Sequence, residues 1–146
     1  MSCNEEAPPP LVPLHLEPET APAVVLVTWD TVRDDHVGQD LNPLNRTPVF
    51  DELATEGVRF MEARSVAPIT LPAHASLLTG RFPSAHGARG NGGFQISTEV
   101  KTLAEELSAQ QYRCGAFVSA PVLDSETGLD RGFEHFDDNI AVGSTG

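Results

Sequence analysis

One run of this sequence restricts the fold more than any other. Residues Val24 to Trp29 are mostly apolar and β-branched, with no alternation between apolar and polar positions. A strand with one face exposed to solvent alternates between apolar and polar residues. A run that is apolar on both faces is instead typical of a central strand in a parallel sheet. The run therefore predicts an α/β protein in which Asp30 lies at the carboxyl end of a central strand.

The remaining pattern alternates helices with strands. Pro48 and Pro72 each follow a residue that suits a helix start, and Gly57 and Gly80 suit the helix ends. Strands that alternate with helices predict a doubly wound, mostly parallel sheet with helices on both faces. The expected elements are helices beginning at Thr47-Pro48, at Leu71-Pro72 and near Ser97 or Thr98, strands at Val58–Ala63 and Tyr112–Ser119, and a short edge strand within Gly128–Asp138.

Residues 1–21 contain five prolines and little periodicity, so we expect a disordered linker followed by a folded part at 22–146. Cys3 before this acidic segment resembles the mature start of a bacterial lipoprotein, which would tether the chain to a membrane in the periplasm or cell envelope. An ordinary cysteine in a disordered tail explains it equally well. No stretch of the sequence approaches the ~20 apolar residues of a membrane span.

The formal net charge of −12 argues against nucleic-acid partners, because phosphate backbones are bound by a surplus of Lys and Arg. Five arginines in the first two-thirds of the chain still leave room for a small-anion pocket. They are Arg33, Arg46, Arg64, Arg81 and Arg89.

A second informative segment runs from Pro68 to Gly80 and places Thr70 directly before Leu71-Pro72. We expect Thr70 at a helix N-terminus, where backbone N–H groups favour an anion. Its hydroxyl is either a nucleophile, once a base or a metal lowers its pKa, or an ordinary N-cap. These residues alone favour the cap.

Asp30 also has two interpretations. The carboxyl ends of the strands are where open α/β sheets bind ligands, and a buried carboxylate there must be protonated, paired or bound to a metal. The alternative is an N-cap for the turn at Thr31–Asp34.

The order of segments from Val24 to Asp138 resembles the sulfatase-like hydrolases of the alkaline phosphatase superfamily. Their signature reads Cys/Ser-x-Pro-x-Arg followed by Ala-Ser-Leu-Leu-Thr-Gly, and this chain has Thr70-Leu-Pro-Ala-His74 followed by Ala75-Ser-Leu-Leu-Thr-Gly80. The resemblance implies an alkaline phosphatase-like sheet, incomplete here, and hydrolysis of esters with a divalent metal (Zn, Mn or Ca). It also implies that Asp30 and Thr70 bind that metal.

Several residues depart from the sulfate-specific pattern. Thr70 stands where sulfatases carry the Cys or Ser that matures to formylglycine. Thr31 replaces a second metal-binding Asp, and Ala116 replaces an anion-binding Lys. Thr70 to His74 is similar to the Thr-x-Pro-x-His segment of nucleotide pyrophosphatases/phosphodiesterases, and lipoteichoic-acid synthases also use a Thr nucleophile. These relatives attack phosphorus directly.

The same relatives imply roles for two further residues. Asn91 corresponds to an Asn that contacts the phosphoryl group, and its N–H₂ group would donate to a developing oxyanion. A turn residue beside Gly92-Gly93 explains Asn91 equally well. His74 replaces the signature Arg, and it either bonds the nucleophile, orients the helix or packs within it. His86 and the pair Arg33 and Asp35 are interpreted as structural.

Complete relatives supply further metal ligands, an Asp-His or Asp-Asn pair, from far downstream. Asp138-Asn139 does not suit that role. We therefore expect the chain to be the N-terminal part of a larger hydrolase and to be inactive alone.

Three functions follow from this pattern. The first is hydrolysis of a sulfate or phosphate ester of a small molecule, glycan or lipid through Thr70. The second is true sulfuric ester hydrolysis on the same fold. The third is a non-catalytic, surface-tethered binding module. The sequence leaves the oligomeric state open.

Overall fold

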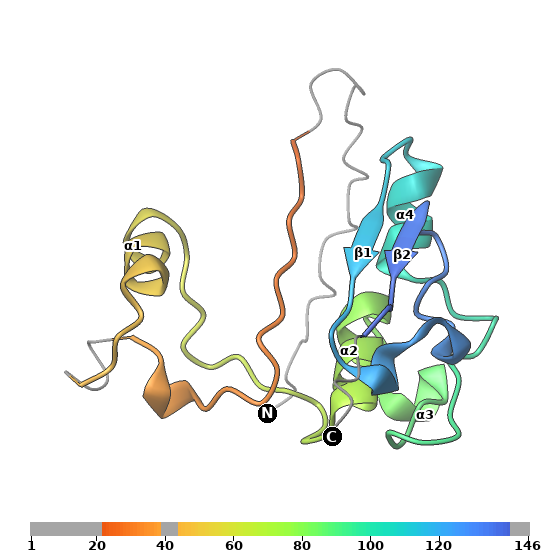
Figure 1. Cartoon of the computed structure of the whole chain (residues 1–146), viewed down its shortest axis with the longest axis horizontal. Helices are drawn as coiled ribbons and strands as arrows, with labels where there is room; N and C mark the ends of the chain where they lie inside the picture. The colour runs from red at the N-terminus through yellow and green to blue at the C-terminus, as the bar shows by residue number, and fades with distance from the viewer. Residues whose placement is uncertain (1–21, 39–43, 141–146) are drawn as a thin grey trace, which may run out of the picture.

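The structure of the protein, a computed structural model, describes residues 22–38 and 44–140 (Figure 1). The expected linker and Cys3 lie outside these ranges. The α-helices are α1 (Pro48–Glu56), α2 (Thr70–Thr79), α3 (Pro83–His86) and α4 (Leu103–Ala109). The 3-10 helices are η1 (Asp34–His36), η2 (Pro121–Leu123) and η3 (Ser125–Thr127), and the strands are β1 (Gly115–Phe117) and β2 (His135–Asp137).

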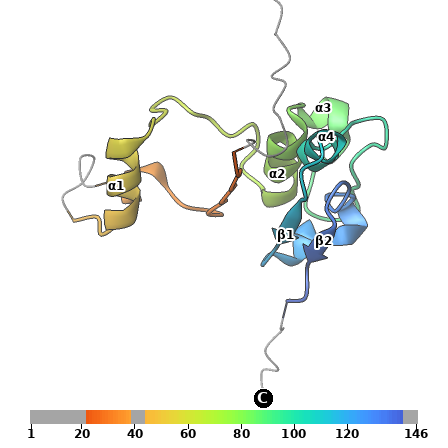
Figure 2. The ribbon, with the colours of Figure 1, turned by 90° about the horizontal axis from the view of Figure 1, so that it is seen from above.

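The two strands pair in parallel, with Ala116 opposite Phe136. A parallel pair needs a crossover connection, which η2 and η3 provide. Figure 2 shows α2, α3 and α4 gathered on one side of this pair. The α/β class and the parallel pairing are confirmed, as is a short strand inside Gly128–Asp138, and the sheet of the described residues has two strands.

Two of the expected strands are absent from that sheet. Val24–Trp29 is extended but has no ladder, and Val25 and Val27 are 83% and 81% exposed. Val58–Ala63 is irregular and exposed. The prediction of a buried central strand at Val24–Trp29 is wrong for the described residues. A strand forms only where another strand supplies partners for its N–H and C=O groups, and none lies beside either segment.

The core lies between α2 and the chain from Ala88 to Leu129. Leu71 and Ala75 of α2 are almost completely buried against Ala88, Ile96 and Leu129. The helix ends at Gly80, whose φ of 64° lies in the left-handed region that favours glycine. Leu77, on another side of the same helix, is 52% exposed.

Helix α4 begins later than its expected Ser97 or Thr98 start. Thr102 is the N-cap, and its hydroxyl oxygen accepts the Glu105 N–H at 3.1 Å. The Glu105 carboxylate accepts the Thr102 N–H at 2.8 Å, which completes a capping box.

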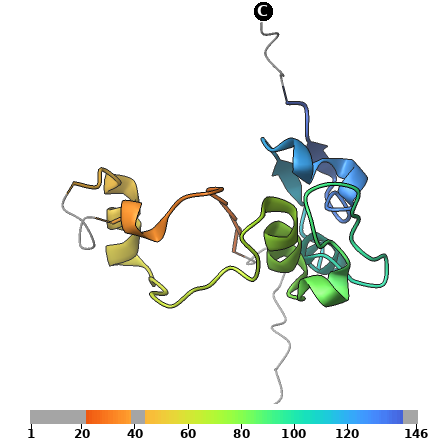
Figure 3. The same ribbon diagram turned by 90° about the horizontal axis from the view of Figure 1, so that it is seen from below.

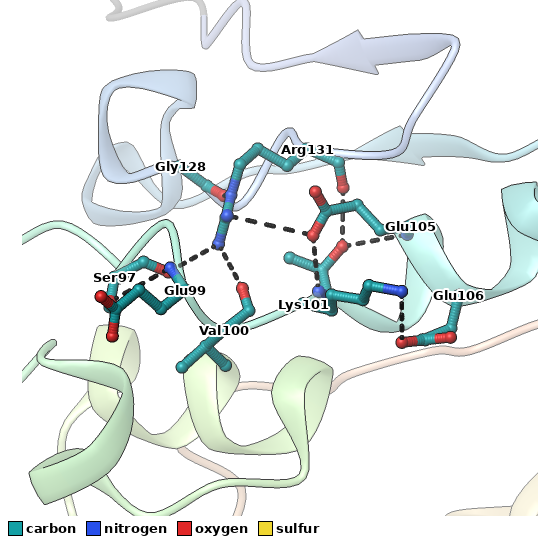
Figure 4. Close-up of polar contacts among 9 residues, drawn as sticks. Ser97, Glu99, Val100, Lys101, Glu105, Glu106, Gly128 and Arg131 are labelled. Atoms are coloured by element: carbon teal, nitrogen blue, oxygen red, sulfur yellow. Dashed lines mark hydrogen bonds and ion pairs between the residues drawn. The ribbon is translucent and has the colours of Figure 1, made fainter.

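Arg131 ties the start of α4 to the turn before β2 (Figure 4). Its guanidinium donates to the carbonyls of Ser97, Val100 and Gly128 at 2.9–3.2 Å. Its own carbonyl accepts the Thr102 hydroxyl at 2.7 Å. The next residue, Gly132, has a φ of 88° and lies so close to the backbone of α4 that a Cβ there would overlap the Glu105 nitrogen.

Helix α1 spans the bounds expected from Pro48 and Gly57, but none of its residues is buried. Leu53, a large apolar residue of this helix, is 63% exposed. Figures 1 and 3 show α1 apart from α2, α3 and α4. In the described ranges, no helix has the length and apolar character needed to cross a membrane.

Candidate active site at the start of α2

The first turn of α2 presents Thr70. Ile69 is the N-cap in extended conformation, and Thr70 is the first helical residue. Pro72 suits this turn because the N–H groups at a helix start lack intrahelical acceptors. No side chain caps this end, so the capping interpretation of Thr70 is wrong and its hydroxyl is available for other contacts.

The Thr70 hydroxyl donates to the Asp30 carboxylate, with Oγ1 and Oδ2 3.2 Å apart. The alternative role of Asp30 as a cap is not realised, because η1 begins after Arg33 and has no side-chain cap. The residue after Asp30, Thr31, has a φ of 59°, which is unusual for a β-branched residue and costs roughly 1–2 kcal/mol. This hydrogen bond thus joins two segments that are forty residues apart in the sequence.

Asn91 contacts the backbone of Leu71, the residue after Thr70. Its side-chain oxygen accepts the backbone N–H of Leu71 at 2.9 Å. Since a backbone N–H can only donate, this bond fixes which end of the amide is the oxygen. The N–H₂ end has no protein partner among the described residues and stays available as a donor.

His74 contacts the main chain of Thr70 and not its hydroxyl. Nδ1 lies 2.9 Å from the Thr70 carbonyl oxygen, and Nε2 lies 3.1 Å from the Thr28 hydroxyl. Thr28 was not singled out in the sequence. The spacing of the residues could have indicated it. Thr28 and Asp30 are two apart in an extended segment and so share a face, and Thr70 and His74 are four apart in a helix and also share a face.

His86 is completely buried and holds α2 to α3. Nδ1 accepts the Ala88 N–H at 3.2 Å, so Nε2 carries the hydrogen and donates to the Ser76 hydroxyl at 2.9 Å. Burial lowers the pKa of His86 because the charged imidazolium loses hydration. The structural interpretation of His86 agrees with these contacts.

Two other expectations concern charged residues. Arg33 and Asp35 form the exposed ion pair expected from their spacing, and the Arg33 hydrogen bond lowers the pKa of the Asp35 carboxyl. Asp138 accepts the Ser125 N–H at 2.9 Å and its hydroxyl at 2.8 Å, and these bonds lower the pKa of its carboxyl. Asp138 is thus engaged at the start of η3.

The donors at the site fit a divalent cation only in part. Asp30 and Thr70 offer a carboxylate and a hydroxyl oxygen, which hard cations prefer. Among the residues that the structure describes, no group of three or more His, Cys, Asp or Glu side chains could hold a metal ion. Within the described ranges, Asp30 and Thr70 would supply two ligand side chains, which is less than a complete metal site.

A cavity of about 400 Å³ adjoins Asn91. Phe94 and Val122 give it apolar walls, and Asp124 and Glu126 are its acidic lining residues. The lining of the cavity next to Asn91 is therefore partly apolar and partly acidic.

Comparison with known proteins places this arrangement in context. A family model described as Sulfatase matches residues 22–145. The chain is 38% identical over 93 residues to an ulvan-active sulfatase of Formosa agariphila, an alignment that covers 64% of this chain and 18% of the relative. No solved structure matches the chain.

Two further relatives show the same pattern. An arylsulfatase of Clostridium perfringens is 36% identical over 91 residues, which is 62% of this chain and 19% of the relative. Arylsulfatase A of Bos taurus is 35% identical over 101 residues, which is 64% of this chain and 20% of the relative. Each alignment therefore spans about a fifth of the relative's length. The match of the family model over most of the sequence shows that this chain belongs to the sulfatase family.

Proposed function

We propose that this chain carries the nucleophile of a metal-dependent hydrolase that cleaves phosphate or sulfate esters through Thr70. The observation that carries the proposal is the 3.2 Å contact between the Thr70 hydroxyl and Asp30 at the start of α2. A hydroxyl attacks an ester only when its proton is removed or its pKa is lowered. Asp30 is the described group placed to accept that proton or to share a cation with it.

A divalent cation on Asp30 and Thr70 would supply the positive charge that lowers the pKa of the hydroxyl. The remaining ligands would come from residues outside the described ranges. The start of a ten-residue helix adds partial positive charge at the same place, which favours the anionic group of the substrate.

Asn91 supports the proposal as the oxyanion donor. The Leu71 N–H holds its oxygen, so its N–H₂ group is oriented without a competing described partner. A preoriented donor stabilises charge that develops in the transition state, and removal of one such donor typically costs about 100- to 1000-fold in kcat.

Phosphate is the substrate that Thr70 favours, because threonine cannot become formylglycine, and Thr31 and Ala116 also depart from the sulfate pattern. Sulfate is the second candidate, since the relatives compared above are all named as sulfatases. The whole protein would act on an ester of a small molecule, glycan or lipid. A tether through Cys3 would place it in the periplasm or cell envelope.

The test compares wild type with Thr70→Ala on an aryl sulfate and an aryl phosphodiester. It uses this chain and any longer product of its gene, after chelation and after addition of Zn²⁺, Mn²⁺ or Ca²⁺. We expect Thr70→Ala to lose at least about a thousandfold in kcat/KM. Thr98→Ala, an exposed threonine away from the site, is the matched control and should retain activity. Full activity of Thr70→Ala would contradict the proposal.

A further inference from the structure

His74 joins two segments that little else connects. The Thr70 carbonyl can only accept a hydrogen bond, so Nδ1 of His74 carries the hydrogen. In the neutral ring, Nε2 is then the acceptor, and the Thr28 hydroxyl donates to it. One imidazole thus links the first turn of α2 to the extended segment that precedes Asp30.

The two periodicities of the backbone make this link possible. In an extended chain, residues two apart point to the same side, so Thr28 and Asp30 both face α2. In a helix, residues four apart lie one above the other, so Thr70 and His74 both face the extended segment. The result is two parallel contacts, Thr28 to His74 and Asp30 to Thr70, at 3.1 Å and 3.2 Å.

The position of Asp30 depends on these contacts. Residues 24–30 make no backbone hydrogen bond to the described residues 70–140. Across the described ranges, the hydrogen bonds from residues 22–38 to residues 70–140 are the two side-chain contacts at Thr28 and Asp30. The Thr28 contact is therefore the one that aligns the segment without using the reacting hydroxyl.

We infer that His74 is a positioning residue, which together with Thr28 holds Asp30 opposite the Thr70 hydroxyl and does not itself touch the reacting atoms. This inference rests on the proposed function, in which Thr70 is the nucleophile. It differs from the expectation that His74 bonds the nucleophilic hydroxyl, because His74 contacts the carbonyl of Thr70 and the side chain of Thr28.

The test removes the link from the end that is distant from the chemistry. Thr28→Val keeps the shape of the side chain and removes the hydroxyl. A neutral hydrogen bond contributes about 1 kcal/mol, so we expect kcat to fall about fivefold with KM nearly unchanged. His74→Asn, whose amide can still reach the Thr70 carbonyl, should show a similar fall. The double variant should lose no more than either single variant, because both changes break one link. Thr98→Val is the matched control and should have wild-type activity.

A second readout needs no turnover. Nitrogen NMR of the 146-residue chain should show His74 with the hydrogen on Nδ1, and Thr28→Val should change the Nε2 signal while that of His86 stays constant. Wild-type kcat in Thr28→Val, multiplicative losses in the double variant, or an unchanged Nε2 signal would overturn the inference. If Thr70→Ala is fully active, the proposed function fails. If Thr70→Ala is inactive but Thr28→Val has wild-type kcat, the positioning role alone fails.

Discussion

Residues 70–140 contain most of the buried apolar side chains of the described ranges, whereas most large apolar side chains of the described residues before Thr70 are exposed. Of the eight buried hydrophobic residues of the described ranges, Val37 alone precedes α2. The later region also holds the parallel strand pair, the capping box and the Arg131 contacts. The candidate site spans both regions, since Thr70 and Asn91 lie in the packed one and Asp30 in the open one. The packed region thus supports Thr70 and Asn91, whereas the position of Asp30 depends on two side-chain contacts.

The largest effect should come from Gly132→Ala in the packed region. Its φ of 88° strains any other residue, and the new Cβ would overlap the backbone of α4. Strain and overpacking together should lower the free energy of unfolding by about 4 kcal/mol in urea denaturation. Gly92→Ala is the matched control, because open space surrounds that position, and it should change stability by less than about 1 kcal/mol. Equal stability of the two variants would mean that α4 is not packed on this turn.

A pair of leucines tests the two regions directly. Leu129 is 2% exposed, and Leu129→Ala should cost about 3 kcal/mol of unfolding free energy through lost burial and a cavity. Leu53 of α1 is 63% exposed, and Leu53→Ala should change stability by less than about 0.5 kcal/mol. Chemical denaturation of both variants gives the comparison. A large cost at Leu53 would show that α1 is buried in solution.

The smallest effect concerns pH. Burial lowers the pKa of His86, so the unfolded chain takes up a proton at higher pH than the folded one. Stability is therefore complete above the unfolded pKa of about 6.5 and declines as pH falls toward the folded pKa, with a slope of at most about 1.4 kcal/mol per pH unit. Unfolding of wild type and His86→Gln between neutral and acidic pH measures the difference.

The difference between the two unfolding curves isolates the contribution of His86, because the other titratable groups are the same in both proteins. If His86→Gln is too unstable to unfold cooperatively, NMR titration of wild-type His86 reads the same pKa. A value at or above 6.5 would contradict the account.

The sequence predicted local features well where residues near in sequence decide them. Pro48 and Gly57 bound α1, and Gly80 ends α2, because helix starts and ends depend on a few adjacent residues. The prediction of a strand at Val24–Trp29 was wrong, because a strand needs hydrogen-bonding partners that the described residues do not supply. The start of α4 was also misplaced. The N-cap is Thr102, and not Ser97 or Thr98, because the Thr102 hydroxyl also donates to the Arg131 carbonyl, which is distant in sequence.

The sequence indicated which residues belong to the candidate site, but not which atoms of these residues contact one another. The family resemblance implied that Asp30 and Thr70 bind a metal, which stays a prediction. The structure places their side chains 3.2 Å apart, and Asn91 accepts the N–H of the next residue, Leu71. The structure added the orientation of the Asn91 amide and the partner of His74. Both depend on hydrogen bonds between segments, which one sequence does not reveal.

Covalent trapping would show whether Thr70 is the residue that attacks the ester. A radiolabelled phosphodiester or sulfate ester is added, the reaction is quenched in acid, and the peptides are analysed by mass spectrometry, with this chain and any longer product of its gene. We expect label on the peptide that contains Thr70, more from the phosphorus ester than from the sulfate, and none in Thr70→Ala. Turnover with the label on another residue, or with Thr70→Ala as active as wild type, would contradict this expectation.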